Sequence, residues 1–247
     1  MIKLPKLSRQ RIIDEPELSS IDLEWLYFAG CMCGTGYWGW DQDDDLKRFR
    51  AIVKGHFYSA QNRRCCYCSV EIDENRRLYD LEHIIDKNGR GDLMFEVKNL
   101  ASSCVQCNLS KKTKKVLVVD SRPGDPLPEK SKDYLILHPH YDEWSSHFKF
   151  DKYERIVPRP NSKKGAFTFS LCSMDRRNIV RLADYFRHPH RPTAETILLD
   201  LYSPSNTKRA EQLNALKALA ISSGYPDAVA IVGIVENDIA LKESLLT

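Results

Sequence analysis

Apolar and polar residues alternate in patterns that predict helices at both ends of the chain and short strands between them. Before residue 60, apolar positions recur every three or four residues, which predicts a helix over about 45–60 with one buried face. These positions are Leu46, Phe49, Ile52, Val53 and Phe57. The acidic run 41–45 offers N-cap residues for that helix. A shorter apolar stretch at 23–28 predicts a helix before it.

Further along, short β-branched and aromatic runs predict strands, and longer periodic runs predict helices. The expected strands are 70–72 and 78–85, joined by the polar turn 73–75, and then 134–137, 152–157 and 166–172. The expected helices are 105–113, 175–186, 193–202, 206–222 and 226–245. The fold class is therefore α+β. We divide the chain into an N-terminal arm with helices (1–60), a small core (61–118), a loop-rich extension (119–192) and C-terminal helices (193–247).

Composition narrows the class of protein. No apolar run is long enough to cross a bilayer, and the N-terminus lacks the apolar core of a signal peptide, so we expect a cytoplasmic protein with no membrane partner. The net charge of +3 neither requires nor excludes a nucleic-acid partner. In a cytosolic chain, eight cysteines with close pairs indicate metal binding rather than disulfides.

Two C-x-x-C pairs predict a zinc site. Cys65 and Cys68 form the first pair, and Cys104 and Cys107 form the second. Two such pairs can present four thiolates in a tetrahedron around Zn²⁺. Cys66 is an alternative to Cys65 as a ligand.

An acidic residue and a histidine lie between the two pairs. Glu82 and His83 are adjacent inside an apolar run, and Asn108 follows directly after the second pair. Near the end of a strand, twist or a bulge can bring such neighbours towards one site. Oxygen ligands from Glu82 and Asn108 suit Mg²⁺ or Mn²⁺ rather than zinc.

Together these residues resemble the zinc-knuckle motif of HNH endonucleases. The resemblance covers about 63–115 and follows the family's order of elements: the first cysteine pair, Glu82-His83-Ile84, Asn99-Leu100, the second pair with Asn108, and Lys111. It implies a ββα-metal core with a structural zinc. It also implies that His83 is the general base, that Glu82 and Asn108 are ligands of a catalytic Mg²⁺ or Mn²⁺, and that Asn99 pins the loop between strand and helix. Two positions depart from the family pattern: Glu82, where many members have aspartate, and Asp86, where many have proline.

Basic residues surround this motif. Lys111, Lys112, Lys114 and Lys115 follow the second cysteine pair, and Arg63, Arg64, Arg76 and Arg77 flank the first cysteine pair or the strands beside it. Such clusters bind phosphates without reading bases, and a solvated helix face is the alternative. We interpret them as a nucleic-acid surface, with DNA favoured over RNA as the substrate.

The longer pattern resembles the Septu and retron-associated defence nucleases of bacteria. That resemblance implies a separate ATPase partner, and the chain itself has no G-x-x-x-x-G-K-[S/T] motif. The apolar positions of 193–245 have two interpretations: they build a core, which is the default, or they dock that partner. Two alternatives to a nuclease stay open, namely a non-catalytic zinc-dependent nucleic-acid-binding module and an interaction subunit with an inactive centre.

Several other residues have a structural and a functional interpretation. Cys31 and Cys33 are structural thiols or half of a metal site, and we favour the former. His138, His140 and His147 are core and loop histidines or approach the active site, and we again favour the structural role. Tyr37, Trp38 and Trp40 pack their loop or stack on bases.

Overall fold

Both helices before residue 60 begin at acidic caps, and the sequence analysis predicts this for the second of them. α1 (Leu23–Cys33) starts after Asp22, whose side chain accepts a hydrogen bond from the Trp25 amide. A 3-10 turn, η1 (Gly34–Gly39), leads to α2 (Asp44–Ala60), which Asp43 caps by accepting from the Leu46 amide. α2 buries one apolar face formed by Leu46, Phe49, Val53 and Phe57.

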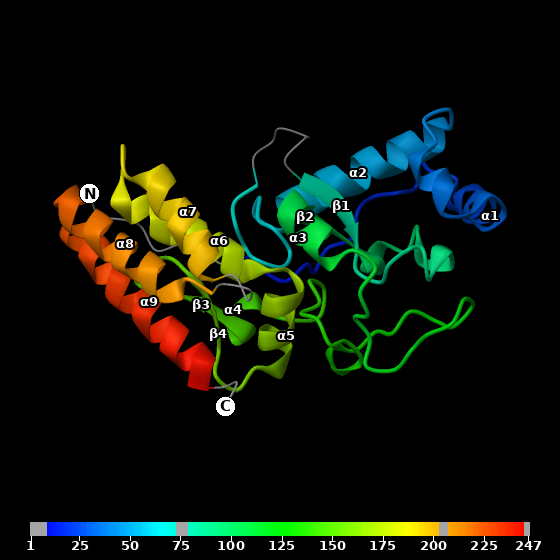
Figure 1. Cartoon of the computed structure of the whole chain (residues 1–247). Coiled ribbons are helices and arrows are strands. Elements are labelled where there is room, and N and C mark those ends of the chain that lie inside the picture. The colour runs from blue at the N-terminus through cyan, green and yellow to red at the C-terminus, as the bar shows by residue number, and fades with distance from the viewer. Residues whose placement is uncertain (1–8, 73–78, 203–206, 245–247) are drawn as a thin grey trace. The chain divides into compact units, whose positions relative to one another are not determined.

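The central strands differ from those expected. β1 (Tyr79–His83) pairs antiparallel with β2 (Leu100–Cys104), whereas 70–72 makes only an isolated bridge between Arg64 and Glu71. The sequence analysis did not predict β2 because this strand is rich in serine. Its serines are buried on the sheet rather than exposed. α3 (Val105–Lys111) follows β2 directly, so a strand–strand–helix order is present (Figure 1). The turn 73–75 and the arginines Arg76 and Arg77 lie outside the residues that the structure describes, which are 9–72, 79–202 and 207–244.

Loops and short elements lie between β1 and β2 and again beyond α3. These are η2 (Gly91–Leu93) and η3 (Val97–Asn99) before β2, and then η4 (Ser131–Asp133), α4 (Trp144–His147), β3 (Phe148–Phe150) and β4 (Ile156–Pro158). β3 and β4 form a second two-stranded sheet. Residues 134–137, expected as a strand, contribute one bridge between Leu117 and Tyr134.

The expected strand at 166–172 is wrong, because these residues belong to helix α5 (Lys163–Leu171). Its alternating Phe-Thr-Phe-Ser pattern suits a strand, but Ser162 caps a helix by accepting from the Gly165 amide. Thr168 also bonds back to the Lys164 carbonyl, as helical threonines do. Local capping therefore outweighs strand propensity in this segment.

The remaining helices fall where the sequence predicts them. They are α6 (Met174–Ala183), η5 (Asp184–Phe186), α7 (Arg191–Leu201), α8 (Arg209–Ser223) and α9 (Pro226–Ser244). Among the described residues no helix combines the length and apolar character needed to cross a membrane.

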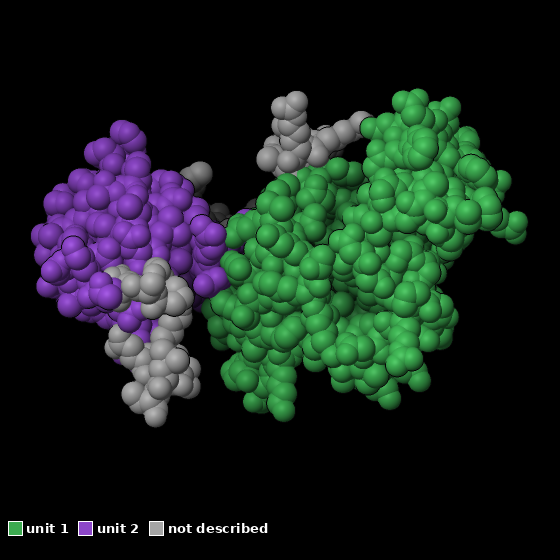
Figure 2. All heavy atoms as spheres, turned by 45° about the vertical axis from the view of Figure 1, so that its right-hand side comes forward, with its two compact units in different colours: residues 1–149, 157–174 green, residues 150–156, 175–247 purple. Residues whose placement is uncertain are grey.

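The chain divides into two compact units (Figure 2). Unit 1 comprises 1–149 and 157–174, and unit 2 comprises 150–156 and 175–247. Unit 2 has its own core, in which Leu198, Leu216 and Ile231 are fully buried and Leu199, Leu213 and Ile234 pack against them. The apolar positions considered for docking a partner therefore build this core.

Candidate active site and metal centre

β1, β2 and α3 place two groups of side chains at opposite ends of one strand pair. In the antiparallel register Tyr79 faces Cys104, and His83 faces Leu100. β2 therefore runs from the His83 end to the Cys104 end. α3 then runs back towards the His83 end. The ammonium of Lys111, the last residue of α3, donates a hydrogen bond to the His83 carbonyl at 2.9 Å.

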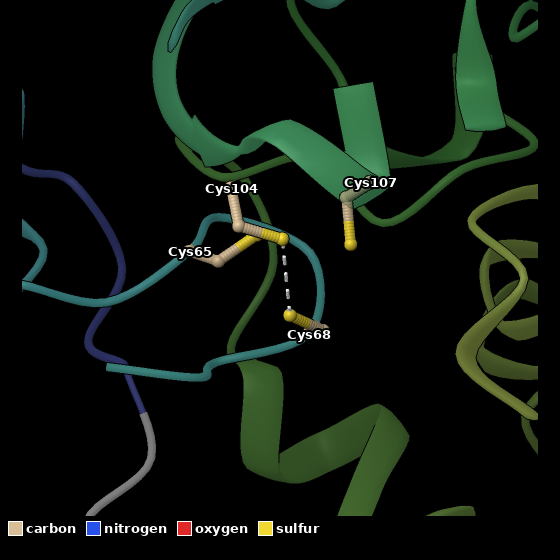
Figure 3. Close-up of side chains that lie close together, drawn as sticks. All are labelled: Cys65, Cys68, Cys104 and Cys107. Carbon is tan, nitrogen blue, oxygen red and sulfur yellow. Dashed lines mark hydrogen bonds between the residues drawn. The ribbon is translucent and has the colours of Figure 1, made fainter. Parts of the chain in front are cut away.

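The four cysteines predicted as zinc ligands come together at the Cys104 end. Their sulfur atoms all lie within 4.8 Å of one another, and all four side chains are buried (Figure 3). The Cys68 and Cys104 sulfurs are 3.8 Å apart. In a tetrahedral site with Zn–S bonds of about 2.3 Å, two sulfurs are separated by roughly 3.8 Å. The cluster therefore fits a zinc ion. Cys66 is buried but is not part of this group.

The loop that carries Cys65 and Cys68 is also held by hydrogen bonds to buried side chains. The Gln61 amide donates to the carbonyls of Arg64 and Ser102 and accepts from the Ser102 amide, at 2.7–2.8 Å. The buried Arg9 guanidinium donates to the Cys66 carbonyl at 2.7 Å. Arg9 belongs to the segment expected as an N-terminal arm with helices (1–60), so part of this arm packs on the cysteine loop. Nothing in the sequence near Gln61 or Arg9 signals these roles, because their partners are main-chain atoms far away in sequence.

A cavity of about 480 Å³ runs along β1 from Asp80 to His83 and continues past the His83 end of the strand pair. It is lined by the predicted site residues Glu82, His83, Asn108, Lys111 and Lys112, together with Asp80, Asp86, Trp38, Arg50, Lys54 and others. These residues of the sequence motif therefore line one cavity. Asp86, the departure from the family pattern, is part of its wall.

His83 is oriented so that one ring nitrogen is the proton acceptor. Its Nε2 lies 3.0 Å from the Met94 carbonyl, which can only accept, so Nε2 carries the proton and Nδ1 keeps its lone pair. The ring contacts Trp38, with 4.5 Å between ring centroids. Burial, together with the positive charge of Lys87, lowers the pKa of His83 to about 3, so the imidazole is neutral near pH 7. A neutral, oriented imidazole is what a general base requires.

Glu82 is buried and paired with a lysine. Its Oε1 lies 2.7 Å from the Lys111 ammonium and accepts from the Tyr67 hydroxyl at 3.2 Å. Burial raises the pKa of Glu82, and the interactions with Lys111 and Tyr67 oppose that rise. Lys111 was expected in an exposed phosphate-binding cluster, but its side chain is only 2% exposed. Its position lets it stabilise a buried carboxylate instead.

Asn108 and Asp80 form a third part of the cavity wall. The Asn108 side-chain nitrogen donates to an Asp80 carboxylate oxygen at 2.8 Å, which leaves the Asn108 side-chain oxygen for another partner. Sequence reasoning did not single out Asp80. Strand alternation could have found it, because Asp80 precedes Glu82 by two residues and therefore shares its face. Asp80, Glu82 and Asn108 together offer oxygen donors of the kind that Mg²⁺ or Mn²⁺ prefers.

Asn99 binds the loop that joins β1 to β2, whereas the resemblance implies a loop between strand and helix. It is fully buried, and its side-chain oxygen accepts from the Ile85 amide at 2.7 Å. Its side-chain nitrogen donates to the carbonyls of Ile85 and Leu93, both at 3.1 Å. One side chain thus fixes both ends of the loop that presents the Met94 carbonyl to His83.

The remaining basic residues differ in their surroundings. Lys112, Lys114 and Lys115 are exposed, although Lys115 pairs with Asp120 at 2.7 Å. Arg63 is exposed near the Tyr58 ring, whereas Arg64 is half-buried and donates to the Ser69 carbonyl. Positive charge at the cavity therefore comes from the exposed Lys112 after α3 and from the half-buried Arg50, Lys54 and Lys87.

The other histidines and cysteines lie away from the cavity wall. His138 is fully buried and stacks on Tyr141, His140 bonds to the Leu100 carbonyl at 2.8 Å, and His147 bonds to the Ser162 hydroxyl at 2.6 Å. These are structural positions, as favoured from the sequence. Cys31 and Cys33 are exposed and, within the described residues, belong to no metal-binding group.

Comparison with known proteins gives one distant relative. The chain is 26% identical to the Septu protein PtuB of Bacillus thuringiensis over 120 residues, which make up 49% of this chain and 37% of the relative. No family model matches the chain, and no solved structure matches it significantly. The comparison thus supports the narrower of the two resemblances without defining the chemistry of the site.

Proposed function

We propose that this chain is a metal-dependent endonuclease of the HNH type that hydrolyses phosphodiester bonds in nucleic acid, with DNA as the preferred substrate. The observation that carries the proposal is the convergence of His83, Glu82 and Asn108 on one cavity, beside a four-cysteine cluster on the same strand pair. A purely structural zinc module has no need for a neutral, oriented histidine at an open cavity.

His83 supplies the base in the proposed reaction. A water molecule in the cavity gives its proton to His83 Nδ1, while Nε2 stays bonded to the Met94 carbonyl. The hydroxide attacks the phosphorus, the P–O bond to the leaving oxygen breaks, and that oxygen takes up a proton. A positioned general base contributes about 10²–10⁴-fold to such a rate.

The oxygen donors of Glu82 and Asn108, with Asp80 beside them, are the residues that would hold Mg²⁺ or Mn²⁺. Such an ion would supply positive charge to the phosphate and the leaving oxygen. The chain's own contribution is to arrange these donors on one wall, with Tyr67 and Lys111 orienting the Glu82 carboxylate.

Positive charge near the cavity supports a nucleic-acid substrate. Lys112 lines the cavity and is exposed, and Lys114 and Lys115 continue the segment. Contacts from lysines to phosphates position a nucleic acid without reading its bases. Sequence choice therefore has to come from elsewhere.

The similarity to a Septu protein supports a role in defence against phage. In this proposal a separate ATPase subunit, implied by the resemblance to Septu and retron-associated nucleases, licenses cleavage by the nuclease chain.

The test is a cleavage assay on plasmid DNA with Mg²⁺ or Mn²⁺. His83→Ala should lower the single-turnover rate by about 10²-fold or more while zinc content and folding stay unchanged. His56→Ala is the matched control, because His56 bonds to the Asp14 carbonyl and does not line the cavity. Equal rates for His83→Ala and the parent would show that His83 is not the base.

The same assay separates the alternatives. A chain that binds DNA but never cleaves it, with any divalent ion and with its co-purified partner present, would be the non-catalytic zinc-dependent module or the interaction subunit instead.

A further inference from the structure

One face of α1 exposes large apolar side chains that the fold leaves uncovered. Trp25, Phe28 and Met32 are 47%, 58% and 71% exposed, and their spacing of three and four residues places them on the same side of the helix. The opposite side, with Leu26, Ala29 and Gly30, is buried. α1 thus has an apolar inner face and an apolar outer face.

Trp40 extends this surface from the neighbouring segment. It is 50% exposed and lies edge-on to Tyr37. One Asp43 carboxylate oxygen accepts from both the Trp25 indole, at 2.9 Å, and the Tyr37 hydroxyl, at 2.6 Å. That shared acceptor holds the segment of Trp40 next to α1. We call Trp25, Phe28, Met32 and Trp40 the α1 aromatic face.

Acidic residues dominate the segment that carries this face, although Arg50 of α2 pairs with Asp41 at its edge. Between Arg11 and Lys47 the sequence has nine acidic residues and no lysine, arginine or histidine, although the chain as a whole carries +3. Asp22 and Glu24 are exposed on or beside α1, and Asp41 is exposed beside η1 and pairs with Arg50 at 2.5 Å. Asp43 is half-buried and bonded directly to Trp25.

We propose that the α1 aromatic face docks a partner protein through a basic, amphipathic helical segment of that partner. Exposed clusters of tryptophan, phenylalanine and methionine are typical of protein interfaces. The surrounding acids select a partner segment with lysines or arginines flanking its apolar residues.

The same charges argue against other occupants. DNA or an anionic membrane would meet repulsion from the acidic rim. A second copy docking symmetrically would bring this acidic surface against itself. The exposed apolar residues of unit 2, such as Ile221 and Val229, lack this concentration of aromatic rings.

The inner face of α1 connects the docking surface to the cavity. A Cβ at Gly30 would lie 2.9 Å from the Phe95 ring and 3.0 Å from the Met94 side chain, so α1 packs directly on the residue whose carbonyl holds His83. A partner bound to the outer face of α1 is therefore separated from Met94, whose carbonyl holds His83, by the thickness of α1. This link to catalysis rests on the proposed nuclease function, whereas the docking itself does not.

The experiment titrates the full chain with a labelled, synthetic helical peptide of leucine and lysine in amphipathic order, read by fluorescence anisotropy. A peptide with glutamate replacing each lysine is the charge control. We expect saturable binding of the lysine peptide only, and about tenfold weaker binding to the double variant Phe28→Ser/Met32→Ser. Ile221→Ser, at a side chain that is 75% exposed on α8, is the matched variant and should bind like the parent.

Several results would overturn the proposal. These are no binding of the lysine peptide, equal binding by the double variant, or equal binding of the glutamate peptide. Dimerisation of the parent that the double variant loses would identify a second copy as the occupant. Because the readout is binding, the result does not depend on whether the chain cleaves nucleic acid.

Discussion

The two ends of the β1–β2 pair are held together in opposite ways. At one end, four cysteine sulfurs within 4.8 Å of one another suit a metal ion that joins the cysteine loop to α3. At the other, Asn99, Lys111 and the Met94 carbonyl fix Glu82 and His83 through hydrogen bonds and one ion pair. With a zinc ion in place, the first end would draw its stability from a ligand. The second depends on burial, so it is stable only while every polar partner is in place.

The largest effect should follow from removing the metal. Cys104→Ser, or chelation, should abolish zinc binding and unfold the Cys104 end of unit 1, because zinc binding in small modules is worth about 10–16 kcal/mol. Elemental analysis and thermal unfolding would measure both. Cys33→Ser, at an exposed thiol outside the cluster, is the control and should change neither. A zinc-free protein with an unchanged melting curve would contradict a structural metal.

The next effect concerns the buried ion pair at the cavity end. Lys111→Met leaves Glu82 charged, buried and unpaired, which should destabilise unit 1 by about 3–5 kcal/mol in urea unfolding. Adding Glu82→Gln should recover most of that loss but not cleavage. Lys112→Met, at an exposed lysine, is the matched control and should leave stability unchanged. If Lys111→Met is as stable as the parent, the pair does not hold this end.

Asn99→Ala should have a smaller effect on stability. It leaves the Ile85 amide and the Leu93 carbonyl without their side-chain partner, which should cost about 2–3 kcal/mol after relaxation. Cleavage should fall more than stability, because the loop no longer presents Met94 to His83. Asn161→Ala, at an exposed asparagine that does not line the cavity, is the control and should leave both unchanged. A rate that falls no further than stability predicts would limit Asn99 to packing.

The smallest effect should come from a polar network outside both ends. Asp142 accepts from the His138 amide, the Ser131 hydroxyl and the Lys164 ammonium at 2.5–2.9 Å, with His147 at 3.6 Å. Asp142→Asn should cost about 1–2 kcal/mol at neutral pH and leave zinc content and cleavage unchanged.

The pH dependence of that variant follows from the direction of the shift. Although burial opposes it, the hydrogen bonds from His147 and Ser131 hold the pKa of Asp142 below its usual range. Its contribution to stability is therefore complete above the unfolded pKa of about 4 and declines as pH falls towards the lower folded pKa. Parent and Asp142→Asn should differ most near pH 7 and converge in acid. A constant difference between pH 7 and pH 3 would contradict this.

The sequence predicts the cysteine end far better than the cavity end. Two C-x-x-C pairs identify Cys65, Cys68, Cys104 and Cys107 because the ligand spacing is a local property. The helices near α2 and α7–α9 are also predictable from caps and periodicity. The partner of β1 is not, because β2 is buried yet rich in serine and its pairing depends on residues about twenty positions away.

The cavity residues show the same limit. His83, Glu82 and Asn108 are recognisable from their motif, but Lys111 was expected at the surface and Asp80 was missed. Each role depends on a partner in another element. Lys111 pairs with Glu82, and Asp80 accepts from Asn108. Gln61 and Arg9 act on main-chain atoms, so no pattern of side-chain types reveals them.

The contacts that orient His83 go almost entirely to main-chain atoms, which sets what kinds of sequence change the site tolerates. The Met94 carbonyl bonds to the His83 ring, and the Ile85 and Leu93 carbonyls accept from the Asn99 side chain. The His83 carbonyl accepts from the Lys111 ammonium. Substituting the side chains at 85, 93 or 94 by others of similar size leaves those carbonyls in place. Inserting or deleting one residue between Ile85 and Leu93 would shift all of them at once. Evolution of this loop is therefore constrained in length more than in composition, unlike most surface loops.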